Sequence, residues 1–293
     1  MNKHITFICT IVLSLLLNGC WDQRLLKDHS LILAIGYDLK SNNILQKTVT
    51  FPQENKDEAQ QKASTNQNEV VSVSGDTAKD TDNKFDQIIP HKFDRSKARI
   101  ILLGENLAQH AGVFPTFDSI YRDLRGPLDA SVAIIKGEAK DALNINKTFS
   151  QLTDEFYFAL LNSAEKSGLI KNQSVQSICP VLLSETTDIV LPYISVQDNS
   201  FAQIDGLALF SGDKMTGTLD VKESIMFLIL SDQIANKLSL NMKISDDNEV
   251  HNKNFVDFVI RKLDRKLKRP PTKVGGFRHK CQRLKSPLRL KSS

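Results

Sequence analysis

Short apolar runs separated by polar stretches divide the first part of the chain into strands and helices. Alternating or continuous apolar character predicts strands over residues 31–37, 44–51, 70–73, 97–104 and 128–136. Apolar spacing and glycine stop signals predict helices over 77–88, 105–110, 117–124 and 153–167, with a further helical turn over 137–143. The polar stretch 53–69 is expected to form a long exposed loop. Because strands and helices alternate, we expect a mixed β-sheet with covering helices.

A second group of elements follows from about residue 172. The pattern predicts a strand over 190–196, a hairpin of 204–210 with 215–219, and a last strand over 238–244. Residues 221–230 fit either a helix or a buried strand. We therefore predict an α+β protein whose mixed sheets form two successive domains, 20–171 and 172–245. Residues 246–293 follow as a basic tail.

The N-terminus has the pattern of an export signal. A basic start at Lys3 and His4 precedes thirteen mostly apolar residues, 5–17. This run is shorter than the roughly 20 residues that span a bilayer. It ends in Leu17-Asn18-Gly19-Cys20, which resembles a bacterial lipobox, although Asn18 stands where Ala or Ser is usual. The alternative is an uncleaved signal anchor in which Cys20 is incidental.

The lipobox reading assigns a chemical role to Cys20. Residues 1–19 are a signal peptide, cleaved between Gly19 and Cys20. The thiol of Cys20 is the nucleophile that accepts an S-diacylglyceryl group, such as one carrying palmitate, and its freed amine can take an N-acyl group as well. Two acyl chains give stable anchoring. We expect no other membrane-spanning segment, because no other run of 18 apolar residues occurs.

Composition and charge narrow the functional classes. Apolar residues make up 41% and charged residues 25%, as in ordinary globular proteins. The formal net charge of +4 combines +12 on residues 261–293 with −8 on residues 1–260, so a nucleic-acid partner is not indicated. The four cysteines form no C-x-x-C motif, which leaves zinc and redox sites without support. A disulfide between Cys179 and Cys281 stays open.

No motif for catalysis, metal or cofactor binding is present. The sequence lacks H-E-x-x-H, G-x-S-x-G, Walker and G-x-G-x-x-G patterns. The histidines outside the signal and the far tail are scattered without ligand spacing: His29, His91, His110 and His251. Turn chemistry is our explanation for four acids, Asp22, Asp38, Asp94 and Asp205. Asp154 and Glu155 suit the start of a helix. We predict no catalytic residue, no metal, no cofactor and no enzymatic activity.

Several segments together resemble one family. They are Gly19-Cys20-Trp21-Asp22, the run LILAIGYDLK from Leu31, the strand 97–104 with Glu105-Asn106-Leu107-Ala108, and Gly206–Phe210. The chain is similar to the Ger(x)C lipoproteins, the C subunits of spore nutrient germinant receptors, over residues 1 to about 245. This resemblance implies three α+β domains on the outer face of the spore inner membrane or cell membrane. It also implies integral-membrane A and B type partner subunits and no catalysis.

Two other functions remain as alternatives. A solute-binding lipoprotein of a transporter would share the lipobox and would need two lobes of similar size around a cleft. A lipid-anchored hydrolase would need a catalytic motif, which the sequence lacks.

The end of the chain departs from the family pattern. Where the third domain is expected, residues 261–293 hold thirteen Lys or Arg and one acid. One explanation is a frameshifted or truncated gene, because A-rich genes read out of frame encode such tails; the product would then be non-functional. A second is a basic tail attracted to anionic lipid. A third is nucleic-acid binding, which we do not expect.

Overall fold

The computed structural model describes residues 3–5, 7, 29–52, 68–89, 92–145, 152–184, 186–197, 201–231, 238–243 and 255–260. The chain divides into two compact units, Met1–Asn236 and Lys237–Ser293. Among the described residues, no helix is both long enough and apolar enough to cross a bilayer.

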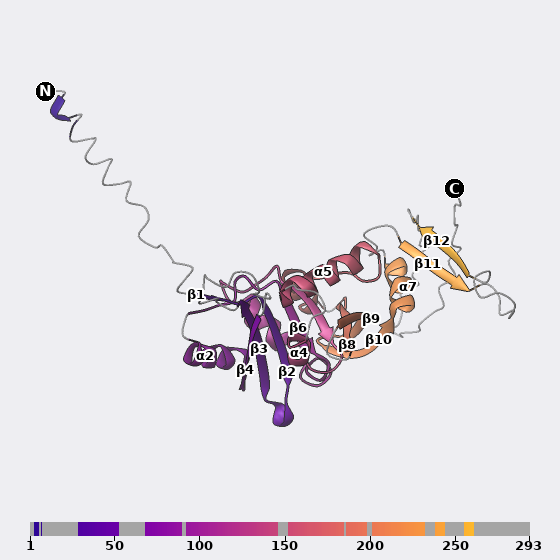
Figure 1. Ribbon diagram of the computed structural model, residues 1–293, viewed down its shortest axis with the longest axis horizontal. Coiled ribbons are helices and arrows are strands. Elements are labelled where there is room, and N and C mark those ends of the chain that lie inside the picture. Colours follow the sequence, from indigo (N-terminus) through magenta and orange to yellow (C-terminus); the bar gives the residue numbers. More distant parts are fainter. Residues whose placement is uncertain are drawn as a thin grey trace, which may run out of the picture. The chain divides into compact units, whose positions relative to one another are not determined.

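The first unit is built on one eight-stranded sheet (Figure 1). In spatial order its strands are β10 (Lys214–Asp220), β9 (Phe201–Ser211), β8 (Val190–Gln197), β7 (Ser131–Ile135), β6 (Ile100–Gly104), β2 (Ala34–Leu39), β3 (Leu45–Pro52) and β4 (Asn68–Gly75). The four central strands β8, β7, β6 and β2 are parallel. Antiparallel strands extend the sheet on both sides. A short parallel pair, β1 (His29–Leu31) with β5 (Lys92–Asp94), forms a separate small sheet.

The central strands are buried on both faces, which explains their continuous apolar sequences. Every residue of β6 and β7 is buried. Successive side chains point to opposite faces, so Ile101 and Leu103 pack into one core while Ile100 and Leu102 pack into another.

Helices cover both faces of the sheet. The first core contains residues from α2 (Ala78–Ile88), the π-helical turn η4 (Leu107–Ala111), α3 (Phe114–Tyr121) and α6 (Val175–Leu182). The second contains residues from α4 (Ala139–Leu143), α5 (Thr153–Lys166) and α7 (Val221–Ser231). A single 3₁₀ turn, η2 (Ser41–Asn43), joins β2 to β3. Mixed strands with helices around them confirm the predicted α+β class.

Most predicted elements are present, and the differences have local causes. Residues 221–230, which fitted helix or strand, form α7. The helix expected over 117–124 begins at Phe114, because Pro115 suits the first turn of a helix, and it ends at Tyr121. Helix α6 was not predicted; its internal Pro180 hides a short helix that a Ser174–Ser177 capping box starts.

The predicted domain boundaries fall within structural units. The boundary at 171/172 lies inside the first unit, and the strands before and after it, β7 and β8, pair with each other. In the second unit, β11 (Leu238–Lys243) pairs in antiparallel fashion with β12 (Phe255–Ile260), so the boundary at 245/246 lies between two paired strands. Residues 1–19, apart from 3–5 and 7, and residues 261–293 lie outside the described part of the chain.

Candidate functional site

The predicted lipid-attachment site, Gly19 and Cys20, lies outside the residues that the structure describes. Cys179 is buried in α6 and Cys281 is outside the described residues, so their disulfide stays a prediction. Among the described residues, no three His, Cys, Asp or Glu side chains come together as metal ligands.

The scattered histidines and acids do not assemble into a site in the described chain. His29 begins β1, and His110 lies exposed in η4 with its Nδ1 3.1 Å from the carbonyl oxygen of Asn106. Asp94 accepts a hydrogen bond from the amide of Ser96 at 2.9 Å, as turn chemistry predicts. Asp154 is buried at the start of α5, with Oδ2 3.8 Å from Arg99, while Glu155 is exposed in the same turn. His91, His251 and Asp22 lie outside the described residues.

For two acids the turn explanation is wrong. Asp205 lies inside the long strand β9, near a register shift in its pairing with β8. Asp38 is buried in β2, and its carboxylate accepts hydrogen bonds from the amides of Ala139 at 2.7 Å and Lys140 at 2.9 Å. It therefore caps the first turn of α4 from a strand about a hundred residues away in sequence, which no local signal reveals.

Asp38 occupies the place where open α/β sheets usually bind ligands. That place is outside the carboxyl ends of the parallel strands. Here Gly104, the last residue of β6, lies so close to Asp38 that a Cβ would overlap its carboxylate. Asn106 donates to the carbonyl of Leu39 at 2.9 Å, and the amide of Glu105 donates to that of Gly137 at 3.2 Å. Contacts within the chain thus fill this edge of the sheet.

Opposing influences act on the pKa of Asp38. Burial raises the pKa of its carboxyl above the ordinary value, while the two amide hydrogen bonds act in the opposite direction. Nearby, Lys40, which follows β2, and Glu138, which precedes α4, form an ion pair at 2.6 Å. The arrangement closes the edge and orients α4.

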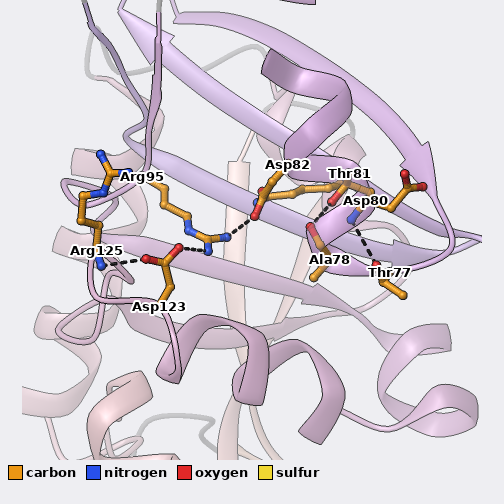
Figure 2. A network of polar contacts seen from close by, with 9 residues as sticks. Thr77, Ala78, Asp80, Thr81, Asp82, Arg95, Asp123 and Arg125 are labelled. Carbon is orange, nitrogen blue, oxygen red and sulfur yellow. Dashed lines mark hydrogen bonds and ion pairs between the residues drawn. The ribbon is translucent and has the colours of Figure 1, made fainter. Parts of the chain in front are cut away.

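The most unusual feature of the fold is a network of four charges, three of them buried and the fourth, Asp123, partly exposed (Figure 2). Lys47 of β3 pairs with Asp82 of α2, and Asp82 also pairs with Arg95 at 2.6 Å. Arg95 reaches on to Asp123, in the turn after α3, at 2.5 Å. Figure 2 shows Arg95 between the two carboxylates, with Arg125 at the Asp123 end. The four alternating charges join a strand, a helix and two connecting segments.

Lys47 lies in an apolar and aromatic environment. Its side chain is fully buried, and its Nζ is 5.3 Å from the ring centre of Tyr37 and 5.1 Å from that of Phe93. Burial lowers the pKa of Lys47 to about 8, and Asp82 opposes this shift. Removing one partner of such a buried pair leaves an uncompensated charge, so the network acts as a structural clamp.

Sequence reasoning missed this network, although one signal was available. Lys47 shares a strand face with Val49 and Phe51 and is the register partner of Tyr37. A lysine on the apolar face of a strand needs a buried acid as partner. Sequence alone does not identify that acid, because α2 carries three aspartates, Asp80, Asp82 and Asp86, and only the fold shows that Asp82 is the buried one.

Comparisons with known proteins give the family. The sequence model for the spore germination protein N-terminal domain matches residues 22–196. The putative spore germination protein YfkR of Bacillus subtilis is 24% identical over 238 residues, covering 77% of this chain and 60% of the relative. Spore germination protein A3 of the same species is 22% identical over 239 residues, covering 74% and 63%.

A third relative and one solved structure also match. Spore germination protein GerQC of Bacillus cereus is 21% identical over 234 residues, covering 79% of this chain and 62% of the relative. The crystal structure of the GerBC protein aligns with a TM-score of 0.41 and 13% identity, covering 80% of this chain and 66% of that one. The chain thus spans about 60% of the length of its curated relatives. Because the family model matches more than half of its residues, the chain belongs to the spore germination protein family defined by this N-terminal domain.

Proposed function

We propose that this protein is a lipid-anchored, non-enzymatic subunit of a spore nutrient germinant receptor. Membership of the family indicates a role in spore germination. The observation that carries the proposal is the extent of the family match, which begins at residue 22, two positions after the Cys20 that ends the lipobox-like sequence. The match therefore starts two residues after the expected first residue of the mature chain, Cys20.

The anchor is the S-diacylglyceryl group on Cys20, formed before cleavage between Gly19 and Cys20. The thiolate of Cys20 supplies the nucleophile, and two acyl chains hold the protein on the outer face of the spore inner membrane or cell membrane. Integral-membrane A and B type subunits are its partners in the same membrane.

A binding role without catalysis agrees with the filled edge of the sheet. The carboxylate of Asp38 accepts hydrogen bonds from the two amides at the start of α4, at 2.7 and 2.9 Å. In many α/β enzymes a ligand binds at this place. The solute-binding alternative gains no support, since the strands described over residues 34–220, apart from the short β5, form one continuous sheet rather than two lobes around a cleft.

A germination assay tests the proposal. Spores lacking the gene, and any paralogue that replaces it, should respond slowly to nutrients but normally to triggers that bypass nutrient receptors. The wild-type gene should restore the nutrient response, and Cys20→Ala should restore it poorly. A normal nutrient response in the deletion strain would contradict the proposal.

A further inference from the structure

The turn after α3 presents a leucine to solvent. Leu124 is fully exposed, and Tyr121, at the end of the helix, is 44% exposed. Two exposed arginines, Arg122 and Arg125, flank the leucine. A large apolar side chain between two cations at a tip has the amphipathic composition of a contact with a lipid headgroup region.

This turn is held in one shape by the buried charge network. Oδ2 of Asp123 forms an ion pair with Arg95 at 2.5 Å, and Oδ1 accepts a hydrogen bond from the amide of Arg125 at 2.8 Å. The amide of Gly126 donates to the carbonyl of Asp123 at 2.9 Å, and a Cβ at Gly126 would overlap the carbonyl of Ile120. Leu124 is therefore exposed by a preorganised backbone, which lowers the entropy lost when it makes a contact.

The turn lies near the point where the N-terminal segment joins the fold. Strand β1 begins at His29 and runs beside β5, with Leu31 paired to Asp94. Arg95 follows Asp94 directly and holds Asp123. The short pairing of β1 with β5 and the side chain of Arg95 thus link His29 to the turn that carries Leu124.

The N-terminal segment is also short. Eight residues lie between Cys20 and His29. At roughly 3.3–3.6 Å per extended residue, they reach at most about 30 Å. An anchor at Cys20 consequently keeps the β1–β5 end of the fold, and the turn beside it, within reach of the bilayer surface.

We propose that the Tyr121–Arg125 turn rests on the bilayer, with Leu124 inserted among the lipid headgroups and Arg122 and Arg125 beside their phosphates. This inference rests on the proposed anchor at Cys20. The contact fixes the orientation of the anchored fold. A bilayer is the expected partner, because the anchor at Cys20 holds this end of the fold close to lipid and the exposed cations Arg122 and Arg125 are attracted to anionic headgroups.

Spin labelling of the full chain on vesicles tests the contact. Nitroxide is attached at Leu124→Cys, with Ile44→Cys as the matched control, in a chain carrying Cys281→Ser. Ile44 is also an exposed apolar residue, 37% accessible, but it follows β2 at the end of that strand remote from β1. On phosphatidylglycerol–phosphatidylcholine vesicles, the label at 124 should show several-fold lower accessibility to a water-soluble nickel chelate than the label at 44, and higher accessibility to oxygen.

The outcomes separate this inference from the anchor itself. A second attachment, through a hexahistidine sequence before Trp21 on lipid that carries a diamagnetic cobalt(III) chelate, keeps the test valid even where Cys20 carries no lipid. Equal water accessibility at positions 124 and 44 in both attachments would overturn the contact. A label at 124 that is protected only in membranes containing integral-membrane receptor subunits would also overturn it, in favour of a protein partner.

Discussion

At the residue scale, the fold depends on charges that have little or no access to water. Lys47 is fully buried, and Asp82 balances both it and Arg95. The sequence pattern places Lys47 on an apolar strand face but does not identify its partner, because pairing across about 35 residues depends on the tertiary fold. Asp38 shows the same limit, since its hydrogen-bond donors lie about a hundred residues further on.

Replacing Asp82 by Asn should strongly destabilise the protein. The change leaves Lys47 and Arg95 buried without a counter-charge, which typically costs about 3–5 kcal/mol. Asp80→Asn is the matched control on the same helix, because the side chain of Asp80 is 37% accessible and pairs at 2.9 Å with Lys84, which is also open to solvent. Its effect on the free energy of unfolding should stay within about 0.5–1 kcal/mol. Urea denaturation measures the free energy of unfolding of both variants. Equal losses in the two would contradict the stabilising role of the charge network.

Lys47 should also give stability a particular pH dependence. The pKa of Lys47 is about 8 in the folded state and ordinary, near 10.5, when unfolded. Between these values the unfolded chain binds more protons, so this group makes stability rise with pH, by at most about 1.4 kcal/mol per unit. The free energy of unfolding of wild type minus that of Lys47→Met should increase from pH 8 to pH 10. A flat or falling difference would contradict the assignment.

At the scale of elements, continuous apolar sequence was the reliable signal. It predicts β6 and β7, which are buried at every residue. Short elements gave weaker signals: β1 and β5 have three residues each, and both are held by pairing with each other rather than by local preference. Helix α6 was missed because Pro180 lies inside it. Sequence therefore predicts the centre of this fold better than its connections.

The junction between β2, β6 and α4 should be sensitive to one methyl group. Gly104→Ala places a Cβ against the carboxylate of Asp38, so Asp38 must release the amides of α4 or the strand must move. We expect a loss of about 1–3 kcal/mol in the free energy of unfolding. Gly217→Ala in β10 is the control, because a Cβ there meets no atom within 4 Å. Thermal unfolding of both variants measures the difference, and a neutral Gly104→Ala would contradict this packing.

At the scale of the whole molecule, one sheet crosses the predicted boundary at 171/172. Cutting there removes β8, β9 and β10 and exposes the edge of β7, whose residues are all buried in the intact fold. We expect a fragment of residues 29–171 to lack a cooperative unfolding transition, while a fragment of residues 29–236 keeps one. A cooperative transition in the shorter fragment would instead support two independently folding domains.

The central claim is that Cys20 is the membrane tether of a germination protein. Metabolic labelling with a clickable palmitate analogue tests it most directly, with Cys179→Ala as the cysteine control, because Cys179 is buried in the fold. We predict that the wild-type chain and Cys179→Ala incorporate the label equally and that Cys20→Ala incorporates none. Labelling of Cys20→Ala at the wild-type level would contradict the account.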